Sequence, residues 1–327
     1  MNEVAYRAAE RRLWQSRGVL PTEQHVELRR TGITVRIQES GQGPPVLFIH
    51  GANTSGASWV ALASKLTDFR CLVLDRPGTG LSEPLRGALD RERVNRLGDT
   101  LVGEVLDALQ LDDAHVAATS LGGFMALRSA AAEPTRVRRM IQFSWPVGAP
   151  TTWLPLIMRI NGVPGLGRLM ARLPPSERSV RMTFRQIGHA SSLEDGRITL
   201  EDRDTYLALL RHTPTLKEDQ RLAAIFVSWR TGLERAMLPS ETLARVSAPT
   251  HFIWGERDPF GGPATARDVV ALLPNASLEI VPAAGHAPWL DELDRCAASV
   301  RRHLNADDLE QDGPREAEMA MNVGVMR

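Results

Sequence analysis

Short apolar runs that alternate with helical patterns constrain the fold of this chain more than any other feature of its sequence. Residues 46–50 (VLFIH) and 71–74 (CLVL) are nearly continuous apolar runs, which is typical of strands buried on both faces. Residues 59–66, between them, have a helical pattern. Strands that alternate with helices in this way favour a mostly parallel sheet covered by helices on both faces. We therefore predict an α/β fold.

The same alternation continues along the chain. Further strands are predicted at residues 25–30, 33–39, 115–119, 137–143, 249–255 and 278–281. Helices are predicted at residues 3–15, 94–109, 121–132, 265–273 and 290–304. The helix at 94–109 is the clearest, because its apolar residues recur at the spacing of one helical face.

The alternation is interrupted between residues 151 and 242. This stretch has helical patterns and several prolines, and no strand is predicted in it. We interpret residues 148–242 as a helical cap inserted into a core formed by residues 1–147 and 243–304. Ligands of open α/β sheets bind at the carboxyl ends of the strands, so such a cap covers the site. The polar and then Met-rich residues 305–327 are predicted to be a disordered tail.

Composition excludes several classes of partner. Lys plus Arg and Asp plus Glu number 39 each, so no net charge attracts the chain to nucleic acid. No apolar run approaches the roughly 18 residues of a membrane helix, and the charged N-terminus lacks a secretory signal. The two cysteines, Cys71 and Cys296, form no disulfide framework. We expect a cytoplasmic protein without a membrane partner, and the spacing of its residues indicates no metal site and no cofactor.

Ala118-Thr119-Ser120-Leu121-Gly122-Gly123 follows one predicted strand and opens the next helix. A serine on so tight a turn projects its hydroxyl from the sheet edge, where it can act as a nucleophile. The two glycines provide the small neighbours that the turn requires, although Ala118 stands where the G-x-S-x-G pattern has its first glycine. The alternative is that Ser120 is simply a helix N-cap.

A nucleophilic serine needs a histidine base and a carboxylate that orients it, and both should follow it at strand ends. Asp258 comes directly after the strand at 249–255, and His286 follows the strand at 278–281. Glu256 is a rival carboxylate, and ordinary turn positions are the alternative for Asp258 and His286. Three such residues in the expected order favour a catalytic triad of Ser120, Asp258 and His286.

These motifs resemble the α/β-hydrolase superfamily, in its capped branch with a serine nucleophile. The matching residues are His50-Gly51, the run 75–82 (DRPGTGLS), the turn at Ser120, the run 254–258 (WGERD) and the run 285–288 (GHAP). The resemblance implies that the backbone N–H groups of Ala52 and Leu121 form an oxyanion hole. We expect His50 to order this loop and not to titrate in catalysis.

The pocket for a small-molecule substrate is predicted from residues near the strand ends and in the cap: Trp145, Asn53, Trp153 and Met158. Further apolar cap residues, among them Met182, Phe184 and Phe226, either line this pocket or form the core of the cap itself.

The predicted activity is carboxylesterase-like hydrolysis of a small apolar substrate through an acyl-enzyme. His286 takes the proton of Ser120, and Asp258 orients His286. Two alternatives keep the triad, namely hydrolysis of C–C bonds and perhydrolase chemistry. A third is a ligand-binding receptor on a hydrolase scaffold. Asp-nucleophile chemistry is disfavoured, since Ser120 stands at the nucleophile position.

Overall fold

The computed structural model describes residues 2–150, 174–228, 232–233 and 237–306. The predicted pocket residues Trp153 and Met158 lie outside these ranges, as does almost all of the tail predicted at 305–327.

An eight-stranded sheet forms the centre of the molecule, with the order β1-β2-β4-β3-β5-β6-β9-β10. Its strands are β1 (Thr22–Leu28), β2 (Ile33–Ser40), β3 (Pro45–Ile49), β4 (Arg70–Leu74), β5 (Ala114–Thr119), β6 (Val137–Phe143), β9 (Thr250–Gly255) and β10 (Ala276–Val281). Strand β2 runs antiparallel to both of its neighbours, and the other neighbouring pairs are parallel. The prediction of a mostly parallel sheet is therefore confirmed.

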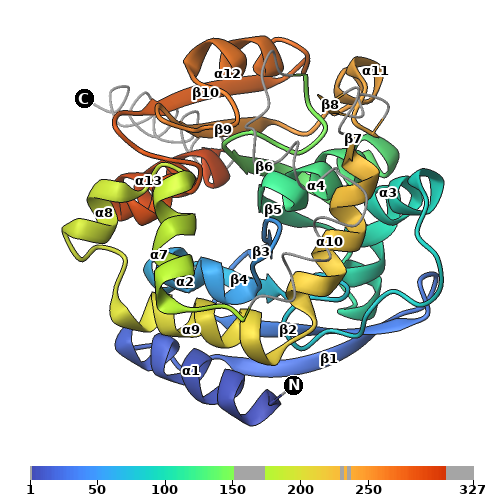
Figure 1. Cartoon of the computed structure of the whole chain (residues 1–327). Helices are drawn as coiled ribbons and strands as arrows, with labels where there is room; N and C mark the ends of the chain where they lie inside the picture. The colour runs from blue at the N-terminus through green and yellow to red at the C-terminus, as the bar shows by residue number, and fades with distance from the viewer. Residues whose placement is uncertain (1, 151–173, 229–231, 234–236, 307–327) are drawn as a thin grey trace, which may run out of the picture.

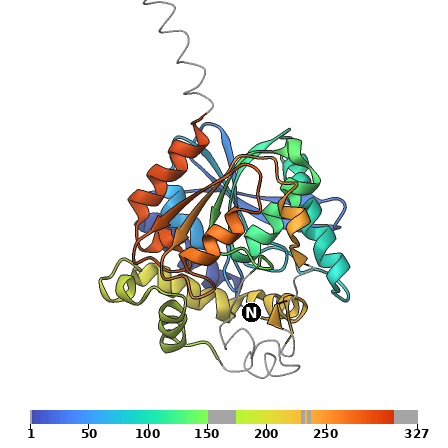
Figure 2. The ribbon, with the colours of Figure 1, turned by 90° about the horizontal axis from the view of Figure 1, so that it is seen from above.

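Helices cover both faces of the sheet, because alternate residues of each strand point to opposite faces. In β3, Leu47 and Ile49 join one hydrophobic cluster, and Val46 and Phe48 join another. The first cluster includes residues of α3 (Arg91–Ala108), α4 (Ser120–Ala132) and α12 (Pro263–Val270). The second includes residues of the 3-10 helix η1 (Gly56–Trp59), α2 (Val60–Lys65) and α13 (Leu293–Leu304). Figure 2 shows the two helical layers with the sheet between them.

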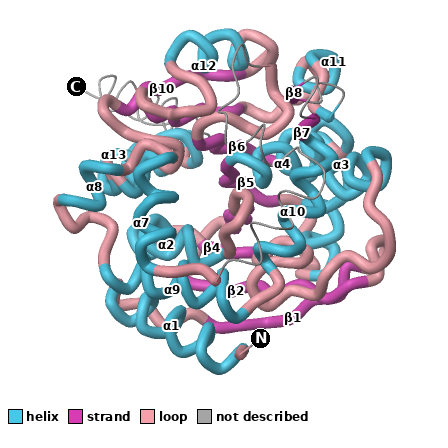
Figure 3. The backbone as a smooth tube through the Cα atoms, in the orientation of Figure 1, coloured by secondary structure: helices cyan, strands magenta, loops and turns pink. Residues whose placement is uncertain are grey.

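The inserted region is mainly helical where it is described. It contains α7 (Glu177–Gln186), α8 (Ala190–Glu194), α9 (Leu200–His212), α10 (Thr215–Phe226) and α11 (Ser240–Leu243). Figure 3 shows α7 and α9 on one side and α10 on the other side of the central strands β3 and β5, whereas α8 and α11 lie farther out. The expectation of no strand between 151 and 242 is wrong, since β7 (Val227–Ser228) and β8 (Gly232–Leu233) pair antiparallel. Strands of two residues are too short to produce an alternating pattern.

The first helix, α1 (Glu3–Ser16), packs against the cap helix α9, and the two lie side by side in Figures 1 and 3. The Thr205 hydroxyl donates to the Ala9 carbonyl over 3.2 Å. The Arg17 guanidinium donates to Asp202 over 3.0 Å. Helix α1 is therefore a link between the sheet and the cap.

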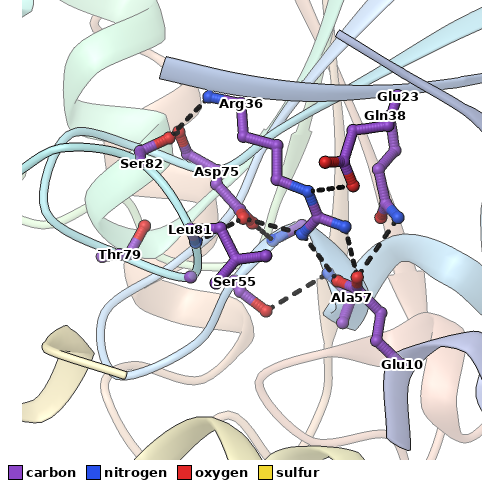
Figure 4. Close-up of polar contacts among 12 residues, drawn as sticks. Glu10, Glu23, Arg36, Gln38, Ser55, Ala57, Asp75, Thr79, Leu81 and Ser82 are labelled. Atoms are coloured by element: carbon purple, nitrogen blue, oxygen red, sulfur yellow. Dashed lines mark hydrogen bonds and ion pairs between the residues drawn. The ribbon is translucent and has the colours of Figure 1, made fainter. Parts of the chain in front are cut away.

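A buried arginine joins α1 to the sheet (Figure 4). The Arg36 guanidinium forms ion pairs with Glu10, Glu23 and Asp75, and its side chain is only 2% exposed. Glu10 comes from α1, and it also accepts a hydrogen bond from Tyr6. Burial raises the pKa of Glu10 despite the arginine beside it.

We expect Arg36→Leu to destabilise the fold by about 3–5 kcal/mol, because Glu10 and Asp75 would remain buried without a guanidinium partner. Urea unfolding followed by circular dichroism measures the change. Arg96→Gln is the control, since the Arg96–Glu92 pair is exposed and should contribute less than about 1 kcal/mol. Equal losses in the two variants would contradict the structural role of Arg36.

Both cysteines are buried and free. Among the described residues, no helix combines the length and the apolar character needed to cross a membrane.

Candidate active site

Ser120 lies on a sharp turn between β5 and α4. Its φ of 52° is in the left-handed region, which is uncommon for a residue other than glycine and marks a constrained turn. The turn brings α4 close to β3, because a Cβ on Gly122 would lie 2.1 Å from the Ile49 carbonyl oxygen. Ala118 is fully buried within the hydrophobic cluster below the turn, so its methyl group is accommodated in place of a glycine.

The loop after β3 lies beside the serine. A Cβ on Gly51 would be 3.1 Å from the Ser120 Cβ, and the next residue, Ala52, is exposed. In the part of the chain that the structure describes, no hydrogen bond engages the backbone N–H of Ala52 or Leu121. Both N–H groups are thus free to donate to a substrate oxygen, and that of Leu121 lies in the first turn of α4.

His50 holds this loop in place. Its Nδ1 contacts Thr54 Oγ1 over 3.0 Å, and its Nε2 accepts the Arg76 N–H over 3.0 Å. Complete burial, with the charge of Arg76 nearby, lowers the pKa of His50 well below its usual value. His50 is therefore a neutral residue that orders the loop.

Asp258 and His286 lie in contact beyond the ends of β9 and β10. The His286 Nδ1 and the Asp258 Oδ2 are 2.9 Å apart, and the Asp258 side chain is fully buried. Asp258 also accepts the backbone N–H groups of Trp145 (3.2 Å) and Phe260 (2.9 Å). The rival Glu256 instead accepts the N–H of Ala283 over 2.8 Å.

The Nε2 of His286 is buried and has no hydrogen-bond partner among the described residues. His286 and Ser120 line one cavity of about 1360 Å³, and no hydrogen bond between their side chains is present. The sequence-predicted residues Trp145, Asn53 and Ala52 line the same cavity. Phe184 of the cap also lines it, whereas Phe226 is buried in the core and Met182 is exposed.

The sequence of the chain matches a known protein family. The model of the alpha/beta hydrolase family matches residues 46–299, which is most of the chain. The chain belongs to this family. A hydrolase from Cupriavidus pinatubonensis that acts on 2-hydroxy-6-oxononadienedioate and 2-hydroxy-6-oxononatrienedioate is 29% identical over 79% of this chain and 86% of its own length.

Solved structures show the same fold. A carboxylesterase from Bacillus subtilis has a TM-score of 0.71 at 20% identity, covering 92% of this chain and 98% of its own. The 2-hydroxy-6-oxo-6-phenylhexa-2,4-dienoate hydrolase of a Rhodococcus strain has a TM-score of 0.70 at 19% identity, covering 88% and 99%.

In this α/β hydrolase, a cap residue contacts the loop that carries Ala52. Asp219 of α10 accepts the backbone N–H of Asn53 and forms an ion pair of 3.0 Å with Arg76. Both charged side chains are at most 1% exposed. Arg76 in turn donates to the carbonyls of His50 and Gly51. The position of the loop therefore depends on a buried ion pair between the cap and the core, and no motif in the sequence indicates Asp219.

A second buried carboxylate supports the loop that carries His286. Asp291 accepts hydrogen bonds from the Gly285 N–H (2.8 Å), from His189 Nδ1 (2.8 Å) and from the Ser192 hydroxyl. Burial alone would raise the pKa of Asp291, but these hydrogen bonds outweigh it and the pKa is lowered. Sequence reasoning also missed Asp291 and His189.

A lowered pKa in the folded state means that ionised Asp291 stabilises the fold above the ordinary aspartate pKa. That contribution is lost as the pH falls through the folded pKa. We expect wild-type stability to exceed that of Asp291→Asn at pH 7, and the difference to shrink below about pH 4. Urea midpoints between pH 7 and pH 3 measure this difference. Parallel pH curves for the two proteins would contradict it.

The hydrolase has no group of three or more His, Cys, Asp or Glu residues suited to a metal ion within its described ranges.

Proposed function

We propose that the protein is a serine hydrolase in which Ser120 is the nucleophile, His286 the general base and Asp258 the residue that orients the base. The observation that carries this proposal is the short contact between His286 and Asp258, combined with a His286 Nε2 that lacks a partner beside the cavity lined by Ser120. A neutral imidazole with a free Nε2 can accept the proton of a serine hydroxyl.

The reaction follows from these positions. Ser120 attacks a carbonyl carbon and transfers its proton to His286, whose charged form is stabilised by Asp258. The N–H groups of Ala52 and Leu121 donate to the oxyanion. The leaving group takes the proton from His286, and water then releases the acyl group from Ser120 by the same proton transfers.

We infer carboxylic esters as the substrate class. Apolar side chains such as Leu13, Phe184 and Leu209 line the cavity, which suits an apolar acyl or alcohol group. Hydrolysis of C–C bonds is the second candidate, because the relative from Cupriavidus pinatubonensis acts on 2-hydroxy-6-oxo dienedioates.

The test compares turnover of p-nitrophenyl esters of increasing acyl length with turnover of 2-hydroxy-6-oxo dienoates. Faster turnover of the esters supports the first assignment, and faster turnover of the dienoates supports the second. If a fluorophosphonate probe fails to label the wild-type protein and neither substrate is turned over, the chain is better described as a binding protein.

A further inference from the structure

The loop that carries His286 is held by three consecutive backbone N–H groups. Gly285 donates to Asp291 over 2.8 Å, His286 donates to the Ile187 carbonyl over 2.9 Å, and Ala287 donates to His189 Nε2 over 3.1 Å. Two of these three acceptors belong to the segment of the cap between α7 and α8. The cap therefore contacts the backbone on which the base is mounted.

The backbone of this cap segment packs directly against the backbone of the core loops. Gly188 has a φ of 94°, and a Cβ there would lie 2.8 Å from the Gly285 Cα and 2.9 Å from the Arg257 carbonyl oxygen. A Cβ on Gly285 would lie 2.5 Å from the Ile187 carbonyl oxygen. The cap segment thus packs against both the loop that carries Asp258 and the loop that carries His286.

The hydrogen bonds fix the protonation of His189. A backbone N–H can only donate, so the His189 Nε2 that faces Ala287 must be unprotonated. The proton is then on Nδ1, where it is donated to Asp291. The side chain is completely buried, and both of its nitrogens are engaged. A neutral imidazole in this single tautomer is therefore required.

His189, Asp291 and Ser192 are the residue types of a triad, yet they cannot act as one. Asp291 lies between the other two and accepts from both. No hydrogen bond joins Ser192 to His189 among the described residues, and the His189 Nε2 is occupied by the Ala287 N–H. The cluster can position other groups, but it cannot activate Ser192.

We propose that His189, together with Asp291, is a positioning residue for His286, through which the cap holds the catalytic base in its working orientation. This inference rests on the proposed function, because it takes His286 to be the base. A rotation of the loop at Ala287 would move the His286 ring relative to both Asp258 and the serine. Misplacing a reacting group by about 1 Å can cost about 10²-fold in rate.

The experiment compares three substitutions of His189 on a chromogenic ester. His189→Phe keeps an aromatic ring but removes the donor and the acceptor. His189→Gln retains both functions on a side chain that can reach Ala287, whereas His189→Asn can still donate to Asp291 but is too short to accept from Ala287. Arg185→Gln is the control, because it removes an exposed ion pair between α7 and α8, the one with Glu194, on either side of the same segment.

We expect His189→Phe to lower kcat by about 10²-fold while KM changes less than about threefold, because alignment and not binding is affected. His189→Gln should recover most of the rate, His189→Asn should not, and Arg185→Gln should have the wild-type kcat. The downfield proton resonance of the His286 Nδ1–H, identified by its loss in His286→Gln, should shift in the Phe and Asn variants and be retained in the Gln variant. If His189→Phe does not fold, the Gln and Asn variants decide the question by the same measurements.

The proposed function and the positioning role of His189 are contradicted by different results. A Ser120→Ala protein with wild-type turnover would overturn the proposed function itself. An inactive Ser120→Ala protein together with a wild-type kcat and an unshifted resonance in His189→Phe, or in His189→Asn, would overturn the positioning role alone.

Discussion

Ser120→Ala is expected to lower kcat for ester hydrolysis by about 10⁶-fold, since removal of the nucleophile of a serine hydrolase leaves only binding and the oxyanion donors. The substitution removes one oxygen from a residue that is only 9% exposed, so the fold should be retained. Steady-state kinetics with a p-nitrophenyl ester measures the effect. Unchanged circular dichroism would exclude unfolding as its cause.

Covalent labelling provides an independent measurement of the same substitution. A fluorophosphonate probe should label the wild-type protein at Ser120 and leave Ser120→Ala unlabelled. Equal labelling of both proteins would show that another residue reacts, and the nucleophile would have to be reassigned.

Asp258→Asn should lower kcat by about 10⁴-fold with little change in KM. Asp258 accepts from His286 and Trp145 on one oxygen and from Phe260 on the other. An amide in this place must turn its NH₂ group toward one of these sides. If it faces His286, the ring is forced into the tautomer that protonates Nε2, and the serine proton cannot be accepted. If the NH₂ group faces Phe260, it opposes the Phe260 N–H, which is also a donor. The negative charge of Asp258, which stabilises the imidazolium of His286, is then still absent.

Glu256→Gln is the matched control for this substitution. Glu256 is an exposed carboxylate two positions away that accepts the N–H of Ala283 and does not contact His286. The kcat of Glu256→Gln should equal that of the wild-type protein. The pH–rate profiles of Glu256→Gln and Asp258→Asn should show whether His286 is affected. A large loss of activity in Glu256→Gln together with an active Asp258→Asn would reverse the assignment of the carboxylate.

Strands with a strong local signal could be predicted from the sequence almost to the residue. The strand predicted at 137–143 coincides with β6. The strand predicted at 115–119 starts at the second residue of β5 and ends at the same residue as β5. Every residue of β5 and five of the seven residues of β6 are buried, so apolar residues dominate both strands and mark them in the sequence. Strand β1, in contrast, begins at Thr22 and not at residue 25, because its first residues are polar and largely exposed at the sheet edge.

The residues that support the site, such as His189 and Asp219, could not be predicted from the sequence for a different reason. Ser120, Asp258 and His286 each follow a strand, so a local pattern indicates where they lie. His189 comes from the segment between α7 and α8, and Asp219 comes from α10. No motif marks either residue, and their importance arises from contacts with residues about 100 to 170 positions away. Such contacts depend on how the cap docks, and periodicity carries no information about docking.

The packing of α1 against the cap affects the order in which the site can be completed. The hydrogen bond from Thr205 to Ala9 joins residues 196 positions apart, and Leu13 of the same helix lines the cavity. Closing so long a loop costs chain entropy that the nearby strand pairings of the sheet do not require. One wall of the cavity is therefore assembled from two helices that lie far apart in the chain, so a chain with a correctly paired sheet still lacks an enclosed site until its first helix has docked.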